Sequence, residues 1–526
     1  TMIGAMRFLL RDTKESRALA KEDFTQLEGA LGGLEGDLKK IQGGGSDLFK
    51  GPLMPFSKTV ALLFEVSTLL GVSLPLLNIL GGAGYAVLLR ERGYGHLPIQ
   101  LTPDRPSSFV LGGAPRLTPA SPASPAAASP AAARRDGSSL QTTMASLLAS
   151  LHAEGELLGA QLCVLDGHSG ACLADVSVGH RAWDEPQPVT STTAFNLGEA
   201  SKLFVALSVL RLVERGSLAL ASAVAPGGVT LEHALAHTAG HLEFLYPAVA
   251  SFAQLCDVDA MSDVAGRTPP LLPPGTRQQY HHTSFGWLLE RACRLAGTSL
   301  QVAWDGFAEA ALGADGARRL SLRAPDGAAA DVAASCKKAT SPRIETVLES
   351  LLVLKTLSSR AARPGASVAD RVDAQVWLCL FGKPQWVEPS AFGRPLARRA
   401  VLPGLQAYAT ARDAAAALRA AAHGGVLGGH TLADARRSRK PPPSPLSTPT
   451  RMPPPFRPVG GEHCEWGLGV QLGTDGEWGH WAANGSFILA IPGRRPLVAA
   501  FLTNRAQSDG AAKQVLERLV AAASGV

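Results

Sequence analysis

The sequence predicts an α+β domain over residues 140–526, in which an antiparallel sheet is flanked by helices and accompanied by a helical subdomain. Short apolar runs that alternate with polar residues, as in half-buried strands, lie near both ends of this stretch, at 161–179 and 466–504. Helical patterns fill the region between them, and the one at 203–213 is almost wholly apolar. A short all-α segment over residues 1–100 is expected to precede this domain.

Composition places the chain among globular proteins with more than one domain. Its 526 residues are 46% hydrophobic and 18% charged, which is enough apolar material for a sizeable core. The net charge of +6 is modest, and the arginines are scattered rather than gathered along one stripe. We therefore expect no nucleic-acid partner.

The cysteines suggest an intracellular, reducing compartment. Seven is an odd number, and no C-x-x-C or Cys/His zinc spacing occurs. We expect buried thiols, no metal site and no cofactor. The cysteines are Cys163, Cys172, Cys256, Cys293, Cys336, Cys379 and Cys464.

Residues 1–100 show helical charge spacing and one long uncharged stretch. The stretch at 66–89 is long enough to cross a bilayer, but Pro75 and the Gly81-Gly82 pair favour two antiparallel helices joined by a turn. Such a helix pair at 51–89 would contact a membrane peripherally rather than span it. The Pro/Ala/Ser-rich residues 101–139 follow and predict a linker.

The elements of the main domain can be assigned in order. A helix at 140–154 precedes a hairpin that turns at Gly167-His168-Ser169-Gly170, and a final helix at 511–523 packs on the completed sheet. Two insertions interrupt this plan. Residues 305–399 are rich in Ala and Gly, with a helix pair around 344–357, and residues 437–461 are proline-rich and predict a disordered loop.

The candidate site lies where the apolar helix begins. Residues 195–216 read FNLGEASKLFVALSVLRLVERG, so Glu199, Ser201 and Lys202 precede a helix that must be covered on nearly all sides. The first backbone N–H groups of a helix are unpaired and favour anion or oxyanion chemistry. Ser201 is about 100° away from Lys202 around the helix, so its side chain points to a different side of the helix.

This segment resembles the nucleophile helix of the serine β-lactamase and penicillin-binding-protein superfamily, of the class C-like, β-lactamase-related kind, whose motif is S-x-x-K. The resemblance extends, in order, to VTLEHALAHTAGHLEFL at 229–245, QYHHTSFGWLL at 279–289 and PGLQAYATARDAAAALRAAAHGG at 403–425. It implies a β-lactamase-like domain over 140–526, with Lys202 as the motif lysine, Tyr280 as the acid/base tyrosine and His480 on the strand that normally carries K-T-G or H-x-G.

Three positions depart from that pattern. Glu199 stands in place of the nucleophilic serine, His282 replaces an asparagine, and Trp481-Ala482 place bulk where the strand normally has glycine. We therefore expect a crowded or closed oxyanion hole. Glu199 is interpreted either as a base or as a first-turn acid that pairs with Lys202 and keeps it protonated. Tyr280 either acts as acid/base or caps the following helix.

Residues 1–100 are similar to the C-terminal tail of UbiB-like (aarF-domain) atypical kinases, in MRFLLRDTKES at 6–16 and PFSKTVALLFEV at 55–66. No phosphate loop, strand lysine or aspartate loop occurs there, so nucleotide chemistry would lie upstream of Thr1. We expect any targeting segment upstream as well, and the resemblance implies a plastid or a mitochondrion as the reducing compartment.

Three functions remain open at this stage. The first is a catalytically degenerate domain that binds a small molecule or a protein in its cleft beside a UbiB-like segment. The second is a hydrolase of esterase or amidase type with a non-standard site made of Glu199, Lys202, Tyr280 and His480. The third is a fragment of a kinase-like ATPase whose active lobe lies upstream.

Overall fold

The computed structural model divides the chain into two compact units, residues 1–130 with 339–353, and residues 131–338 with 354–526. The described residues are 99–101, 109–111, 135–183, 187–241, 249, 251–325, 331–334, 389–443, 465–505 and 509–525. In the first unit they form one antiparallel hairpin, β1 (Ile99–Leu101) and β2 (Phe109–Leu111). The sequence did not predict this hairpin, because its three-residue strands are too short for a periodic signal. β1 lies at the end of the predicted all-α segment, and β2 lies in the predicted linker.

Several predicted features lie outside the described residues: the helices of residues 1–98 with the uncharged stretch at 66–89, the helix pair at 344–357, and most of the loop at 437–461. Among the helices that the structure describes, none has the length and apolar character needed to cross a bilayer.

The second unit is built on a seven-stranded sheet with the order β4-β3-β13-β12-β11-β10-β9. All its neighbouring strands run antiparallel, and the N-terminal hairpin joins the C-terminal strands through the pairing of β3 with β13, as predicted. The strands are β3 (Gly159–Asp166), β4 (Cys172–Gly179), β9 (Glu465–Trp466), β10 (Gln471–Leu472), β11 (Trp478–Trp481), β12 (Phe487–Ile491) and β13 (Leu497–Thr503).

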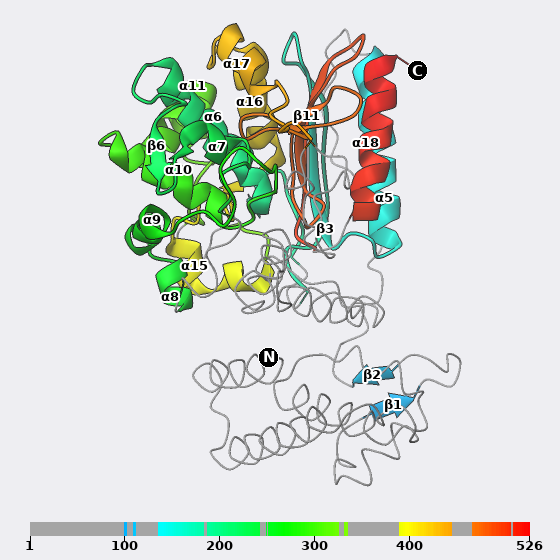
Figure 1. Ribbon diagram of the computed structural model, residues 1–526. Coiled ribbons are helices and arrows are strands. Elements are labelled where there is room, and N and C mark those ends of the chain that lie inside the picture. The colour runs from blue at the N-terminus through cyan, green and yellow to red at the C-terminus, as the bar shows by residue number, and fades with distance from the viewer. Residues whose placement is uncertain are drawn as a thin grey trace, which may run out of the picture. The chain divides into compact units, whose positions relative to one another are not determined.

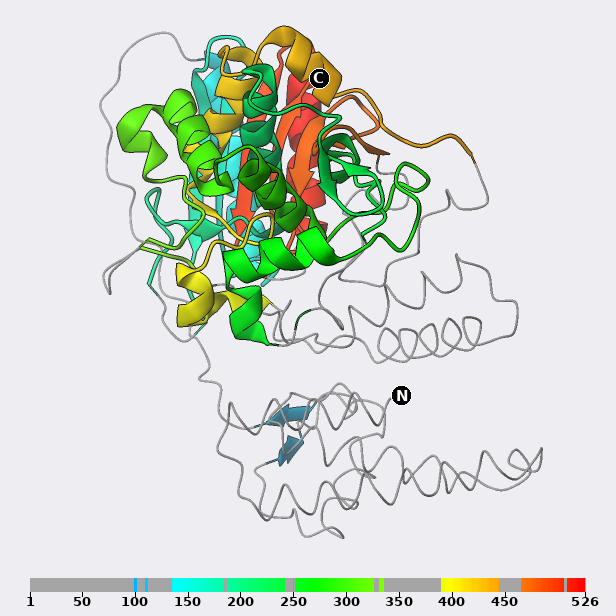
Figure 2. The same cartoon turned by 60° about the vertical axis from the view of Figure 1, so that its left-hand side comes forward.

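Helices cover both faces of the sheet. Figures 1 and 2 show α5 (Arg135–Ala153) and α18 (Asp509–Ser524) on one face and the remaining labelled helices of this unit on the other. Leu148 of α5 and Val515 of α18 share an apolar cluster with Phe487 and Phe501 from the sheet, all of them fully buried. Strand alternation therefore sends one set of side chains into this cluster and the other set towards the helical side.

The helical side is organised around α6 (Ser201–Glu214). Every residue from Ser201 to Leu210 is buried, and Phe204 packs against Trp304 and Phe307 at ring-centroid distances of 6.1 and 6.0 Å. The other helices are α7 (Leu231–Leu235), α8 (Phe252–Leu255), α9 (Val258–Arg267), α10 (Ser284–Leu295), α11 (Leu300–Ala317), α15 (Pro395–Arg399), α16 (Ala411–His423) and α17 (Gly429–Ala435), with 3₁₀ turns η3 (Gly198–Ala200) and η4 (Pro389–Gly393).

The predicted insertion at 305–399 begins too early. Residues 305–317 continue α11, which starts at the Ser299 cap, and Trp304 and Phe307 anchor that helix in the core. The alanines that suggested an insertion are ordinary helix formers here.

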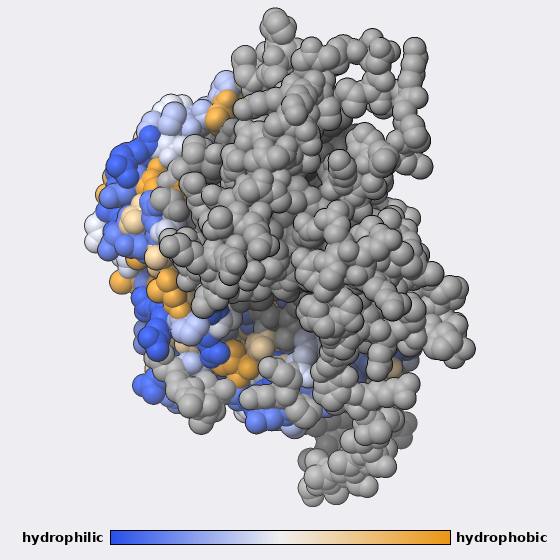
Figure 3. Space-filling view, turned by 90° about the horizontal axis from the view of Figure 1, so that it is seen from below, coloured by the Kyte–Doolittle hydropathy of each residue, from blue (hydrophilic) through white to orange (hydrophobic). Residues whose placement is uncertain are grey.

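Where described residues can be seen in Figure 3, hydrophobic residues lie in small groups among hydrophilic ones.

Two two-stranded pairs complete the described structure. The first, β5 (Phe195–Asn196) with β8 (Tyr408–Ala409), lies directly before η3 and α6, and the second joins β6 (Ala223–Ala225) to β7 (Val229–Thr230). Because β5 ends three residues before Glu199, the contacts that hold β5 in place also position the start of the candidate site.

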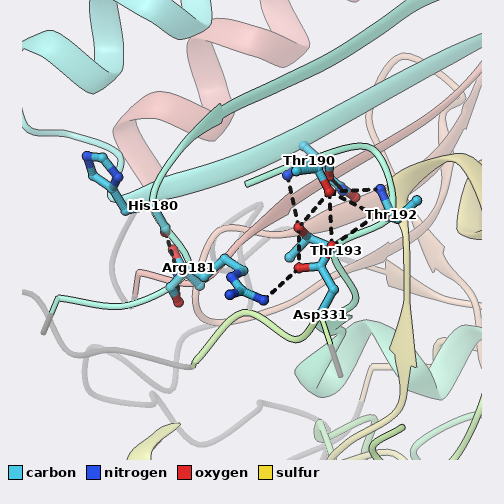
Figure 4. A network of polar contacts seen from close by, with 8 residues as sticks. His180, Arg181, Thr190, Thr192, Thr193 and Asp331 are labelled. Carbon is cyan, nitrogen blue, oxygen red and sulfur yellow. Dashed lines mark hydrogen bonds and ion pairs between the residues drawn. The ribbon is translucent and has the colours of Figure 1, made fainter. Parts of the chain in front are cut away.

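A carboxylate and three threonines anchor the chain just before β5. The hydroxyls of Thr190, Thr192 and Thr193 donate to Asp331 at 2.9, 2.9 and 2.7 Å, and Arg181 Nη1 donates at 3.1 Å (Figure 4). Burial alone would raise the pKa of Asp331, but these hydrogen bonds outweigh it and lower the pKa. The same segment is held by a bond from Ala194 N to the Asp331 carbonyl.

We predict that Asp331→Asn lowers the free energy of unfolding by about 1 kcal/mol at pH 7, since one of the two acceptor oxygens is lost and the site is partly exposed. The lowered pKa means that this contribution is present above about pH 4 and is lost as the pH falls through the native pKa. Urea unfolding at several pH values measures it. The control is Asp305→Asn, on the exposed side of α11. Equal stability of both variants at pH 7 would contradict the anchoring role.

Candidate functional site

A sharp turn delivers Glu199 to the start of α6. Gly198 has φ of 54°, a conformation that glycine adopts without strain, and its N–H donates to Asn196 Oδ1 at 2.9 Å. Ser201 Oγ donates to the carbonyl of Gly198 at 2.6 Å, so this serine closes the turn and is fully buried. The prediction that Ser201 does not replace the missing nucleophile agrees with this local bond.

The Glu199 carboxylate meets the chain that follows β11. Its Oε2 accepts a hydrogen bond from Ala483 N at 3.2 Å, and the side chain is partly exposed. A backbone N–H at this place, just beyond the end of β11, is a candidate oxyanion donor in an acyl-transfer site. Here the N–H of Ala483 donates its hydrogen bond to the Glu199 carboxylate.

Lys202 lies one turn further along and is completely buried. Its Nζ donates to the carbonyl oxygens of His282 at 2.8 Å and Gly404 at 2.5 Å. It also lies 5.1 Å from the centre of the Tyr280 ring, within the range of a cation–π contact. These bonds tie α6 to two distant segments. The predicted pairing of Glu199 with Lys202 stays a prediction.

Tyr280 and His480 lie within hydrogen-bonding distance of each other, with 3.4 Å between Tyr280 Oη and His480 Nε2. Tyr280 stacks on Trp466 at 5.0 Å, and the ring of His282 meets it edge-on at 4.5 Å. The structure therefore gathers the predicted residues Lys202, Tyr280, His282 and His480 from widely separated parts of the sequence. Tyr280 is buried beside Lys202, and its role as an acid/base group or as a helix cap stays a prediction.

The strand β11 corrects one prediction. Trp481 was expected to crowd the site, but the pleat turns it to the opposite face, where it packs on Phe487 at 5.0 Å in the cluster beneath α5 and α18. Ala482 does face the site, and a methyl group added at Gly198 would meet the Ala482 Cβ at 3.7 Å, an ordinary contact. Any crowding therefore comes from Glu199 and Ala482.

A family model described as "Beta-lactamase" matches residues 144–523, which is most of the chain. The chain belongs to the beta-lactamase family. No curated protein matches it.

Solved structures share the fold of this beta-lactamase family member. A family VIII carboxylesterase is 19% identical, with a TM-score of 0.54 over 72% of this chain and 97% of its own. A penicillin-binding-protein homologue from Caulobacter crescentus is 20% identical, with a TM-score of 0.52 over 74% and 99%. A hydrolase with promiscuous acyltransferase activity is 16% identical, with a TM-score of 0.51 over 73% and 99%. At these identities the likeness concerns the fold. The match begins at residue 144, so the similarity of residues 1–100 to UbiB-like proteins gains no support from it.

Buried histidines surround the lysine of this beta-lactamase family member. Burial lowers the pKa of His281 to about 3, and it lowers those of His237 and His480 well below the ordinary value, with Lys202 adding a like-charge contribution to all three. These imidazoles are therefore neutral at pH 7. Within the described residues, no group of three or more His, Cys, Asp or Glu side chains is arranged to hold a metal ion.

His237 and Trp466 belong to this cluster, although the sequence analysis assigned them no role in the site. His237 has a positive φ of 57°, packs on Trp466 at 4.5 Å and accepts a hydrogen bond from His281 N through Nδ1. Ala483 and Gly404 were also missed, because both act through backbone atoms. The sequence could have pointed to Ala483 only through its position three residues after His480.

We predict that the free energy of unfolding falls steeply as the pH drops from about 6.5 towards 3, by up to about 1.4 kcal/mol per pH unit for each buried histidine. The sign follows from the lowered native pKa values: the unfolded chain binds protons that the folded chain does not, so this stability is fully present above pH 6.5 and is lost below it. Denaturant unfolding at several pH values gives the slope of the unfolding free energy against pH. In His281→Gln this slope should be smaller by the contribution of about one proton. The exposed His430→Gln is the control, and an unchanged slope in His281→Gln would refute the assignment.

Proposed function

We propose that this domain does not perform serine acyl transfer and works as a binding module whose recognition group is the Glu199 carboxylate. The single observation that carries the proposal is the hydrogen bond from Ala483 N to Glu199 Oε2. The group at the nucleophile position itself occupies the backbone donor that an acyl-transfer site needs for its oxyanion. A ligand that presents hydrogen-bond donors or positive charge fits the partly exposed carboxylate.

The chemistry of a carboxylate at this position supports the proposal. Attack by Glu199 on an ester or amide would give a mixed anhydride, which persists far less well than a serine ester. The negative charge of the Glu199 carboxylate would also lie beside the oxyanion that develops on a substrate and would destabilise it. Both effects raise the barrier to acyl transfer without disturbing the fold.

The surrounding residues support the same conclusion. Lys202 is committed to two backbone carbonyls, and these bonds link α6 to the segments at His282 and Gly404. In this role Lys202 stabilises the contacts of α6 with these two segments, whether or not a nucleophile is present. The attachment of such a module to a UbiB-like segment remains a further part of the proposal, as do an unknown small-molecule or protein partner and an organellar location.

The rival function is a hydrolase that uses Glu199 as a general base for water. One observation favours it, namely the 3.4 Å separation of Tyr280 Oη and His480 Nε2, which would let a proton pass between two groups beside the site. The names of the structural neighbours make short-chain esters the natural test substrates.

We predict that the unaltered protein hydrolyses neither a chromogenic β-lactam nor a p-nitrophenyl ester and forms no adduct with a fluorophosphonate. Glu199→Ser should gain weak fluorophosphonate labelling within α6, because it supplies a hydroxyl and frees Ala483 N. The double variant Glu199→Ser/Ala482→Gly tests the remaining strand bulk, and Glu199→Gln is the matched control without a nucleophile. Turnover by the unaltered protein that Glu199→Gln abolishes would establish the rival hydrolase instead.

A further inference from the structure

Two cysteines lie diagonally across a pair of neighbouring strands of the sheet, away from the candidate site. Cys163 lies on β3 opposite Asp175, and Cys172 lies at the start of β4 opposite Leu165. The register shifts between these two pairs, so β4 carries an extra residue there. Asp175 lies on the side of Cys163 because the two residues pair directly, and the bulge brings Cys172 onto the same side.

The two thiols are in contact but differ in environment. Each of the two side chains is the largest influence on the pKa of the other, Cys163 is fully buried, and Cys172 is exposed. The Cys172 sulfur also lies 3.5 Å from the carbonyl oxygen of Ala174. The sequence predicted buried thiols throughout. That prediction is wrong for Cys172, because the bulge places it at the solvent-exposed end of the hairpin.

Arg412 provides a positive charge beside the exposed sulfur. Its Nη2 lies 3.7 Å from Cys172 Sγ and 2.5 Å from Asp175 Oδ2, and it reaches across from the first turn of α16. A guanidinium beside a thiol favours the thiolate, which is the reactive form of cysteine. Asp175 holds the guanidinium in position but opposes the thiolate through its own charge.

The pKa directions agree with this geometry. The hydrogen bond from Cys163, aided by Arg412, lowers the pKa of Cys172 to about 7, whereas the same hydrogen bond and burial raise that of Cys163. Burial raises the pKa of Cys256 to about 11 and that of Cys293 to about 12. Among the described cysteines, Cys172 alone therefore has a lowered pKa, which favours its thiolate form.

We propose that Cys163 and Cys172 form a peroxide-sensitive dithiol that closes to a cross-strand disulfide, with Cys172 as the attacked thiolate and Cys163 as the resolving thiol. The oxidant class is a hydroperoxide, ROOH. None of these residues belongs to the site of the proposed function, so this inference stands independently of it.

The chemistry balances in two steps. The Cys172 thiolate attacks the outer peroxide oxygen, the O–O bond breaks, and one proton from water completes the alcohol, giving Cys172-SOH, ROH and hydroxide. The Cys163 thiol then attacks the sulfenic sulfur, forms the S–S bond and releases water, which carries away the thiol proton. Sulfur loses two electrons in total and the peroxide gains them.

The sequence of events follows from the contact between the thiols. While Cys172 is a thiolate, its charge and its hydrogen bond hold the proton on Cys163. Conversion of Cys172 to a neutral sulfenic acid removes that charge, so Cys163 becomes easier to deprotonate when its electrophile appears. In a reducing compartment such a pair would be reduced at rest and oxidised transiently.

Peptide mass spectrometry of the full chain tests the proposal. After brief exposure to hydrogen peroxide at pH 7 and blocking of free thiols, the tryptic peptide that spans both cysteines should be unalkylated and lighter by two hydrogen atoms. Cleavage before Asp166, which lies between the two cysteines, should then give two fragments that separate only after reduction. Without peroxide, iodoacetamide should label Cys172 about fivefold or more faster than Cys256.

Variants separate this mechanism from general oxidation. In Cys163→Ala, peroxide should leave a sulfenic acid on Cys172 that dimedone traps, and in Cys172→Ala, Cys163 should resist both reagents. Arg412→Gln should slow alkylation of Cys172 at pH 7, while Arg398→Gln, in α15, should not. Equal labelling of Cys172 and Cys256, or oxidation of Cys172 to sulfinic acid without linkage to Cys163 in the unaltered chain, would overturn the proposal even where a variant fails to fold.

Discussion

The complete burial of the first three turns of α6 is the constraint on which the rest of the domain depends. A helix that is apolar on all sides needs the sheet on one flank and other helices on the rest, and Phe204 with its neighbours Trp304 and Phe307 shows how α11 fills one of these flanks. The same burial carries Lys202 out of water. Its amino group has hydrogen-bond partners there, because two backbone carbonyls accept from it, and these bonds join the helix to segments that lie far away in the sequence.

That constraint explains how a family fold persists while its site changes. The resemblance to the S-x-x-K motif implies a nucleophile at the start of this helix, at the position that Glu199 holds here. The turn before it depends on Gly198, Asn196 and Ser201, none of which requires a hydroxyl at Glu199. The carboxylate accepts a hydrogen bond from Ala483 N, so a polar side chain at this position has a partner within the fold.

Much of the fold could be predicted from local patterns. The hairpin of β3 and β4, the C-terminal strands, α5, α16 and α18 all follow from alternation, helical spacing and turn residues. The start of the insertion near residue 305 was misplaced, because alanine-rich sequence does not reveal whether a helix continues into the core. The hairpin of β1 and β2 was missed, because its strands are too short for a periodic signal.

The sequence by itself determined the chemical identity of the site: a glutamate instead of serine at Glu199, the lysine at Lys202, and Tyr280 and His480 far downstream. Only the tertiary structure decided what these groups meet. Whether Trp481 or Ala482 faces the site depends on the pleat and register of β11, and the role of Ala483 depends on a backbone atom that carries no sequence signal. The contact between Cys163 and Cys172 likewise arises from one bulge between paired strands. The local sequence pattern indicates whether a residue prefers the buried or the exposed side of its element. Its partners on neighbouring strands are determined by long-range packing.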